Sequence, residues 1–353
     1  MTNPLLVSII IVNYNGAKYL KNCLTSIFNN NYLDFEIIIT DNASTDNSIS
    51  LIKKSFISHL SKIKFVILKK NYGPARARNE GVKRSKGKYF AFLDNDTEVD
   101  PNWIKNALKL FQSNPKIGAI QSKLLLLNQK NKIDYVGEFL GRQGFLKSIA
   151  SYGEIDHGQY DNTEYILAAK SAGMFISKTA FTAAGKFDPS YFIFMEETDL
   201  GWRTWLKGYS VVFCPKSIVY HQFSSTKDIV SKDFNNYLIR FHGTKNYIQT
   251  LIKNLSISNL IKIIPIHIFL WFSLATFLFL TGKFKSSINI YKGIFWNLTH
   301  LSTILSKRHQ IQNHRKLSDQ ELFLKNKLMV KTNIFIYIKK FFESQQKIST
   351  SEN

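Results

Sequence analysis

Hydrophobic residues between positions 5 and 94 gather into four short runs separated by longer, more polar stretches. The runs are rich in β-branched side chains and show little polar alternation, which is typical of strands covered on both faces of a sheet. They are LLVSIIIVN (5–13), FEIIITD (35–41), IKFVILKK (63–70) and KYFAFLD (88–94). Between the first two runs, Leu20, Leu24 and Ile27 recur at helical spacing. The alternation predicts right-handed βαβ units and an open α/β sheet.

The later segments extend this pattern with less regularity. A helix is expected over 101–113, with Asp100 as its cap and Pro101 at its first position. Residues 117–127 predict a strand, whereas the rest of 116–165 predicts loops and short hairpins over the sheet edge. Residues 171–188 predict a strand and a short helix that ends at Gly185, and an acidic turn, a helix and a strand follow over 191–215. The globular part is expected to close near residue 226.

Polar side chains stand where three of the predicted strands end. Because parallel α/β sheets bind ligands at the carboxyl ends of their strands, these residues are candidates for one site. They are Asn13, Tyr14, Asn15 and Gly16 after the first strand, Asp41 and Asn42 after the second, and Asp94, Asn95 and Asp96 after the fourth.

Asp94 and Asp96 are two carboxylates one residue apart at the end of an apolar strand. On an extended backbone, residues at this spacing point to the same side, where two anions repel each other. The pair therefore belongs to a solvated turn, a helix cap or a cation site. Asp41 on a neighbouring strand end favours the cation site.

Composition excludes several classes of protein. The 353 residues carry 44% hydrophobic side chains, enough for a large core, and a formal net charge of +22. The basic residues are dispersed and form no nucleic-acid-binding motif, so we expect no nucleic acid and rather a membrane surface or phosphorylated ligands. Cys23 and Cys214 are expected to be core residues of a cytosolic protein. No dinucleotide or P-loop motif is present, and the N-terminal apolar run predicts a strand rather than a signal peptide.

Six motifs together resemble the family 2 inverting glycosyltransferases of the GT-A type, and most of all their bacterial rhamnosyltransferase-like branch. They occur in the family's order over residues 5–226. They are VSIIIVNYNGAKYLKNCLTSI (7–27), DNASTDNS (41–48), NYGPARARNEG (71–81), FLDNDTEVDPNW (92–103), SAGMFISKTAFTAAGKFDPSYFIFMEETDLGWR (171–203) and VYHQFSS (219–225). The resemblance implies transfer of a sugar from a nucleotide-sugar donor, with Mg²⁺ or Mn²⁺.

The resemblance also implies roles for the acidic residues at the strand ends. Asp94-Asn95-Asp96 resembles the family's D-x-D element, with Asp96 as a metal ligand and Asp94 as a contact to ribose or metal. His221, at the end of a predicted strand, would complete the metal shell or contact phosphate, although a lone histidine is also common as a structural residue. Such a cation would neutralise the charge that develops on a pyrophosphate leaving group.

Nucleotide binding is implied for a second set of residues. Asp41 matches the acid that accepts a hydrogen bond from the base, although it could instead form an Asx turn before the next helix. Asn13 and Tyr14 would border the base. Arg76 or Arg78 could approach the base or the pyrophosphate, or both could be exposed helix positions. A dTDP- or UDP-sugar is the expected donor.

The catalytic base is expected in MEETDLGWR (195–203), where acids cluster beside an apolar run. The family usually has Asp where this chain has Glu197, so Glu197 is the predicted base with Glu196 and Asp199 as alternatives. For Asp199, stabilisation of a helix N-terminus is an equally plain explanation.

Residues 263–282 contain no charged side chain and are long enough to cross a bilayer as a helix. Because both flanks are basic, charge gives no preferred orientation. We expect a monotopic or re-entrant anchor with both ends cytosolic, with a single span as the alternative and a buried helix as a third explanation.

The sequence thus predicts a GT-A catalytic domain over 1–226 and a basic, largely helical region over 227–353 that contains the apolar segment. The expected activity is sugar transfer, possibly of rhamnose, to a lipid-linked glycan at the cytoplasmic side of the cell membrane, in polysaccharide synthesis. A nucleotidyltransferase and a non-catalytic nucleotide-binding membrane partner are the alternatives.

Overall fold

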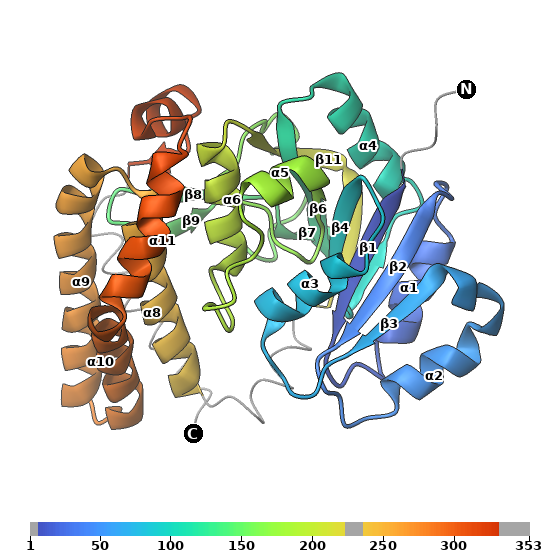
Figure 1. Ribbon diagram of the computed structural model, residues 1–353, viewed down its shortest axis with the longest axis horizontal. Coiled ribbons are helices and arrows are strands. Elements are labelled where there is room, and N and C mark those ends of the chain that lie inside the picture. The colour runs from blue at the N-terminus through green and yellow to red at the C-terminus, as the bar shows by residue number, and fades with distance from the viewer. Residues whose placement is uncertain (1–5, 223–235, 332–353) are drawn as a thin grey trace.

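The computed structural model describes residues 6–222 and 236–331 (Figure 1). The four N-terminal apolar runs form neighbouring strands, as predicted. The main sheet contains, in spatial order, β3 (Ile63–Ile67), β2 (Phe35–Asp41), β1 (Val7–Asn13), β4 (Tyr89–Asp94), β10 (Met174–Ser177), β6 (Ile117–Leu126), β11 (Ser210–His221) and β5 (Thr97–Val99), and β7 (Gln129–Tyr135) pairs with β6.

The sheet is mixed rather than mostly parallel, which corrects the expectation. Strands β1 to β4 run parallel, but β10 lies antiparallel between β4 and β6, and β5 and β7 are short antiparallel additions. The apolar run of β10 is typical of a central strand but carries no signal of direction. Its antiparallel direction follows the long connection over residues 149–173 that precedes β10.

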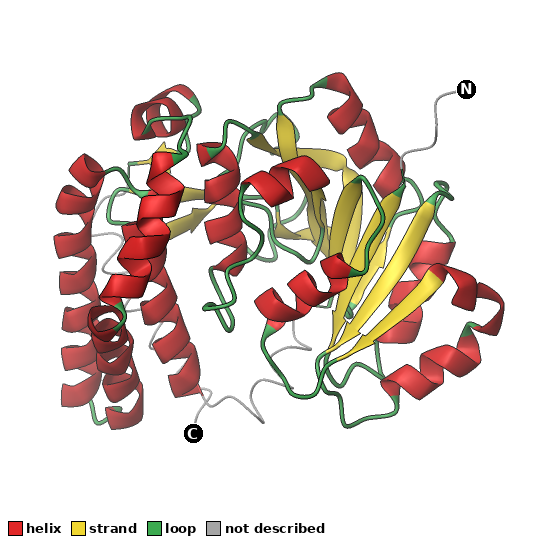
Figure 2. Cartoon of the chain, viewed as in Figure 1, coloured by secondary structure: helices red, strands yellow, loops and turns green. Residues whose placement is uncertain are grey.

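Helices cover both faces of the sheet and close two hydrophobic cores (Figure 2). One face carries α1 (Leu20–Phe28), α2 (Ser48–Ser55), the 3₁₀ turn η1 (Ile57–Lys62) and α4 (Trp103–Ser113), and the other carries α3 (Pro74–Lys83), α5 (Lys178–Ala183) and α6 (Glu196–Leu206). Leu20, Leu24 and Ile27 are fully buried under the sheet, which confirms the periodicity.

The predicted cap of α4 is wrong by two residues. The helix begins at Trp103 with Asn102 as its N-cap, and Pro101 precedes it. Asp100 instead accepts a hydrogen bond from the Asn102 N–H through Oδ1 (2.8 Å), and its carbonyl accepts one from the Trp103 N–H. Asp100 therefore accepts the Asn102 and Trp103 N–H groups in a turn that precedes the helix, instead of capping the helix itself.

Residues 116–165 contain more regular structure than the loops and hairpins we expected. Besides β6 and β7, they form β8 (Glu138–Gly141) and β9 (Leu146–Ser148), which pair antiparallel. A strand from the end of the described chain, β12 (Met329–Val330), pairs with β8 and completes a separate three-stranded sheet.

A layer of helices lies beside the main sheet, at the left of Figure 1. It comprises α8 (Asn236–Asn254), α9 (Ile257–Leu280), α10 (Phe284–Thr299) and α11 (Leu301–Asn313), followed by the π-helical turn η2 (Glu321–Lys325). Leu251, Leu255 and Leu328 belong to the same hydrophobic core as Phe90 and Phe92 of β4. The predicted boundary at residue 226 lies outside the described residues, between two parts that share one core.

Candidate active site

The carboxyl ends of β1, β2 and β4 meet at one rim of the sheet, as predicted. Asn13 is fully buried there, and its Nδ2 donates to Asp41 Oδ1 (2.8 Å) while its Oδ1 accepts from Asn95 Nδ2 (2.9 Å). A side chain at Gly16 would begin 2.1 Å from Asn95 Nδ2, so only glycine fits between these amides. Asn13 therefore connects three strand ends through its hydrogen bonds, and its predicted place beside a nucleotide base stays a prediction.

Asp41 forms the Asx turn that was considered as its alternative. Its Oδ2 accepts from the Ser44 N–H (3.0 Å) and its Oδ1 accepts from the Ser44 hydroxyl (2.5 Å). Tyr14, at the end of the same rim, is half-buried. Recognition of a nucleotide base by Asp41 and Tyr14 stays a prediction, since both lie at the predicted rim.

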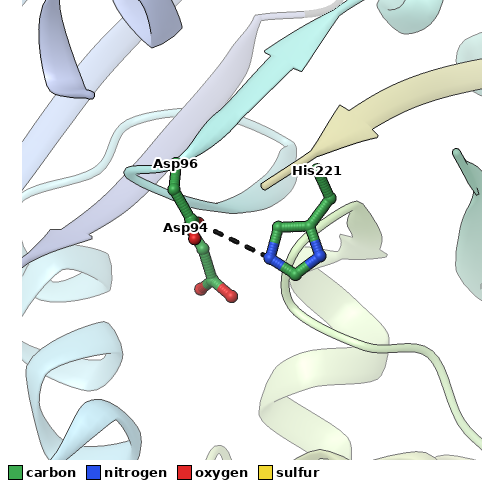
Figure 3. A group of neighbouring side chains, drawn as sticks. All are labelled: Asp94, Asp96 and His221. Atoms are coloured by element: carbon green, nitrogen blue, oxygen red, sulfur yellow. Dashed lines mark ion pairs between the residues drawn. The ribbon is translucent and has the colours of Figure 1, made fainter. Parts of the chain in front are cut away.

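Asp94, Asp96 and His221 come together at the rim from the ends of β4 and β11 (Figure 3). One ligand atom from each lies within 4.8 Å of the others, and His221 Nε2 is 3.5 Å from Asp96 Oδ1. Asp96 is buried, whereas the Asp94 side chain is about a third exposed. The structure thus brings together the three residues predicted to hold a metal.

Asp134 of β7 contacts this cluster through the far ring nitrogen of His221, and the sequence did not predict this residue. Its Oδ2 lies 2.7 Å from His221 Nδ1, which leaves Nε2 facing Asp96. Burial lowers the pKa of His221, but the carboxylates of Asp134 and Asp96 outweigh it and hold the pKa well above its ordinary value. A carboxylate on the far nitrogen of a ligating histidine fixes the ring and raises its basicity.

The donor set fits a hard divalent cation. Two carboxylates and an imidazole nitrogen at mutual distances under 4.8 Å leave space for one ion, and carboxylate oxygens suit Mg²⁺ and Mn²⁺. Without a cation, this pocket collects negative charge, which a protonated His221 and Arg78 partly offset. The open side of Asp94 gives access for a ligand to the ion.

Arg78 of α3 links the metal cluster to the predicted catalytic acids. Its guanidinium lies 3.2 Å from Asp94, 2.9 Å from Glu196 and 3.7 Å from Glu197. The side chain is only 5% exposed, which excludes the exposed position we had considered for it. Arg76 on the same helix is exposed and stacks on Tyr72, 4.1 Å from the ring centre, so the described contacts do not join it to this cluster.

Glu196 and Glu197 open α6, directly after two residues with left-handed backbone, Phe194 and Met195. Burial and the neighbouring charge of Glu197 raise the pKa of Glu196 to about 7. Burial also raises the pKa of Glu197, but Arg78 and the other partners of Glu197 outweigh it and hold the pKa below its ordinary value. The two carboxylates are thus driven apart in basicity, as in many acid–base sites.

Glu197 has a second set of partners that sequence reasoning missed. Its Oε1 accepts from the Ser171 N–H (2.8 Å) and from the Ser171 hydroxyl, and its Oε2 is 4.0 Å from Lys170 Nζ. Lys170 also pairs with Glu138 of β8 at 3.1 Å. Ser171 is the first residue of the SAGMFIS motif, and its position in that motif is the sequence feature that could have identified it as a site residue.

Asp199 faces away from this group, into the protein. It is fully buried, where Arg203 Nη2 (2.8 Å), Lys253 Nζ (2.9 Å) and Asn254 Nδ2 (2.9 Å) surround its carboxylate. These partners come from α6 and α8, so Asp199 joins the catalytic part to the helical layer. As an alternative base it is therefore weaker than Glu196.

This fold and site define a class of enzyme. A mixed sheet with an acidic metal cluster at its rim is the arrangement of GT-A glycosyltransferases. The structure aligns with GalNAc-T7, solved with UDP, GalNAc and Mn²⁺, at a TM-score of 0.56 and 19% identity over 72% of this chain and 48% of that one. It aligns with a mannosyltransferase from Pyrobaculum calidifontis, solved with GDP-Man and Mn²⁺, at 0.54 and 14% over 84% and 88%. The protein therefore has the GT-A fold.

Matches to family models identify the enzyme family of the protein. Residues 89–300 match the glycosyl transferase family group 2, and residues 8–167 match glycosyl transferase family 2. Because the first match covers more than half of the chain, the protein belongs to this family group.

Two curated relatives show how far the similarity extends. An uncharacterized glycosyltransferase of Haemophilus influenzae is 36% identical over 131 residues, covering 37% of this chain and 40% of the relative. The poly-beta-1,6-N-acetyl-D-glucosamine synthase of Staphylococcus epidermidis is 26% identical over 214 residues, covering 61% and 49%. The chain thus spans about half the length of the curated relatives it matches.

Proposed function

We propose that this protein transfers a sugar from a nucleotide-diphospho-sugar to a hydroxyl group of a glycan, with inversion at the anomeric carbon. The observation that carries the proposal is the continuous constellation from the Asp94–Asp96–His221 cluster through Arg78 to Glu197. In this proposal the candidate cation site for a diphosphate and the carboxylate for a hydroxyl proton both neighbour one guanidinium nitrogen, Nη2 of Arg78, which is 3.2 Å from Asp94 and 3.7 Å from Glu197.

A cation bound by Asp94, Asp96 and His221 would neutralise the diphosphate as the sugar–phosphate bond breaks. Glu197 takes the proton of the acceptor hydroxyl while that oxygen forms its bond to the anomeric carbon. The bonding electrons leave with the nucleoside diphosphate. One displacement on the face opposite the leaving group inverts the centre.

Two observations favour Glu197 over Glu196 as the base. The Glu197 side chain is 14% exposed and Glu196 only 4%, so an acceptor reaches Glu197 more readily. Arg78 and Ser171 also hold Glu197 in its ionised, proton-accepting form. Glu196, whose Oε2 has no hydrogen-bond partner among the described residues, would then remain a buried charge partner of Arg78.

The donor and acceptor follow from the family resemblance. We propose a dTDP- or UDP-sugar, with rhamnose as the leading sugar, and a lipid-linked glycan at the cytoplasmic side of the cell membrane. The helix α9, 24 residues long and strongly apolar, supports membrane association. Transfer would then contribute to cell-surface polysaccharide synthesis.

Donor binding tests the proposal directly. Thermal stability of the detergent-solubilised full chain would be measured against dTDP-, UDP- and GDP-sugars, with and without Mn²⁺. We expect one nucleotide class to raise the melting temperature, only with Mn²⁺, and Asp96→Asn to abolish the shift.

A matched control comes from α3. Glu80→Gln removes a carboxylate that pairs only with Lys83 at 2.8 Å on the outer side of that helix, among its described ion pairs. This variant should shift as the wild type does. Donor stabilisation that ignores Mn²⁺ and Asp96 would refute the metal-assisted mechanism.

A further inference from the structure

The helix α9 exposes large apolar side chains along one side. Ile261, Phe269, Phe272 and Phe279 recur at spacings that place them on one stripe, and Phe269 is 68% exposed. Soluble proteins rarely expose a continuous surface of this kind unless it meets a membrane or a partner.

The next helix continues the same surface. In α10, Phe284, Ile288 and Phe295 are exposed at helical spacing. The two stripes meet where the rings of Phe279 and Phe284 lie 5.1 Å apart. We call this surface the outer apolar face: Ile261, Ile266, Phe269, Phe272, Phe279, Leu280, Phe284, Ile288, Phe295 and Leu298. It lies on the hairpin that borders the molecule at the left of Figure 1.

The opposite side of α9 packs against the rest of the protein. Leu274 and Ala275 are fully buried in a cluster with Phe145 and residues of α8 and α10. His267 Nδ1 donates to the Gln143 carbonyl (2.9 Å), and Trp271 Nε1 donates to His267 Nε2 (3.0 Å). A helix held in this way cannot be surrounded by lipid, so α9 would contact a bilayer with one side only.

Charge around the face points to the kind of surface it meets. Residues 236–318 contain eleven Lys or Arg and no Asp or Glu. Lys262, Lys285 and Lys292 are exposed and follow or flank members of the outer apolar face. Apolar side chains bordered by lysines are complementary to the boundary between anionic headgroups and acyl chains.

We propose that α9 and α10 lie in the plane of an anionic bilayer and insert the outer apolar face into one leaflet. The protein is then monotopic, and no helix among the described residues crosses the membrane. This inference deepens the proposed function by naming the surface that brings the transferase to a membrane-held acceptor, and it rests on that function only for the acceptor.

Vesicle binding by the purified full chain tests the proposal. We expect flotation with vesicles that contain about 30% phosphatidylglycerol and weak flotation with phosphatidylcholine alone. Phe269→Gln and Phe295→Gln should each weaken binding about tenfold, because each removes one aromatic ring from the inserted face. Lys292→Gln should weaken it several-fold at low salt and little at high salt.

Controls come from the catalytic half. Leu33 and Ile57 are about 70% exposed but lie far along the chain from the hairpin, and Leu33→Gln and Ile57→Gln should leave flotation unchanged. Lys105→Gln is the matched charge control, since Lys105 is exposed on α4. Circular dichroism and Mn²⁺-dependent donor stabilisation separate a folding defect, or failure of the proposed function, from loss of membrane binding.

Depth measurements distinguish an in-plane helix from a span. An environment-sensitive fluorophore on Ile261→Cys, Phe269→Cys or Phe279→Cys would be quenched by spin labels at different depths, with both native cysteines buried. Equal, shallow depth at all three positions is expected. Three outcomes would overturn the proposal: a depth profile that passes through the bilayer centre, flotation that ignores Phe269 and Phe295, or no flotation with a phenylalanine-dependent dimer of this chain.

Discussion

Replacing Arg78 with methionine should show how strongly one buried guanidinium holds the site together. The substitution keeps a side chain of similar length but leaves Asp94, Glu196 and Glu197 without the cation that lies 3.2, 2.9 and 3.7 Å from them. At an effective dielectric constant of about 20, a pair at 2.9 Å has roughly 5–6 kcal/mol of gross attraction. Desolvation cancels much of it, and removing one partner of a buried pair typically costs about 3–5 kcal/mol.

The exposure of each partner adjusts this magnitude. Asp94 is about a third exposed, so solvent screens its share, whereas Glu196 is almost inaccessible. We therefore expect Arg78→Met to lower the free energy of unfolding by about 4 kcal/mol at pH 8. Because the pKa of Glu196 is already raised and would rise further in the variant, protonation should reduce this loss as the pH falls towards 5.

Urea denaturation at pH 8 and pH 5.5 is the assay, with Arg76→Met as the control. Arg76 lies two residues away, carries the same charge and is exposed, so its loss should cost less than about 0.5 kcal/mol. Mn²⁺ affinity is a second readout, and it should increase while stability decreases. Without the positive charge of the Arg78 guanidinium beside Asp94, Mn²⁺ should bind roughly tenfold more tightly. A stability loss below about 1 kcal/mol at pH 8, or one matched by Arg76→Met, would refute the reasoning.

Three further predictions concern the neighbours of Arg78. Glu197→Gln should lower the transfer rate by about 10²–10⁴-fold while the Mn²⁺-dependent donor stabilisation persists; equal loss of both would assign Glu197 to binding. Asp134→Asn should weaken Mn²⁺ binding about 10–100-fold by releasing His221 Nδ1, as isothermal titration would measure, and unchanged affinity would contradict a supporting role. The pKa of Glu196 near 7 lies above the ordinary 4.5, so the folded state binds a proton there that the unfolded state lacks, and stability falls as pH rises through this window. Glu196→Gln should therefore be about 3 kcal/mol more stable than the wild type well above pH 7 and show no gain below pH 5, which thermal unfolding across pH would test.

The sequence predicted the parts of the site that follow directly from strand ends. Asp94, Asp96 and His221 end or follow apolar runs, and their meeting needs only the general rule for the rim of an α/β sheet. Predicting the position of Arg78 would have required knowing which side of α3 is buried, because Arg78 lies on that side with Ala75 and Gly81. That side is weakly marked in a stretch of small and charged residues, so the sequence could not separate Arg78 from Arg76.

Other features depend on long-range pairing that no local pattern records. Asp134 reaches His221 only because β7 folds back on β6 in one register, and its strand is polar and only partly buried. The sequence also did not predict that α8 packs against the catalytic part, for a different reason. Its buried positions include Thr244, Asn246 and Lys253, so its apolar periodicity does not reveal the buried side.

The hydrophobic core that the parts before and after residue 226 share has a consequence for folding during synthesis on the ribosome. Leu328 belongs to the same core as Phe92, and β12 adds to β8 only after residue 330 has been synthesised. At about 5–20 residues per second, the N-terminal sheet waits roughly 5–20 s after its own synthesis before the last part of its core emerges. During that interval the part of this core that Leu251, Leu255 and Leu328 complete stays uncovered, so chaperones should bind there, and the arrival of the C-terminal helices should end that association.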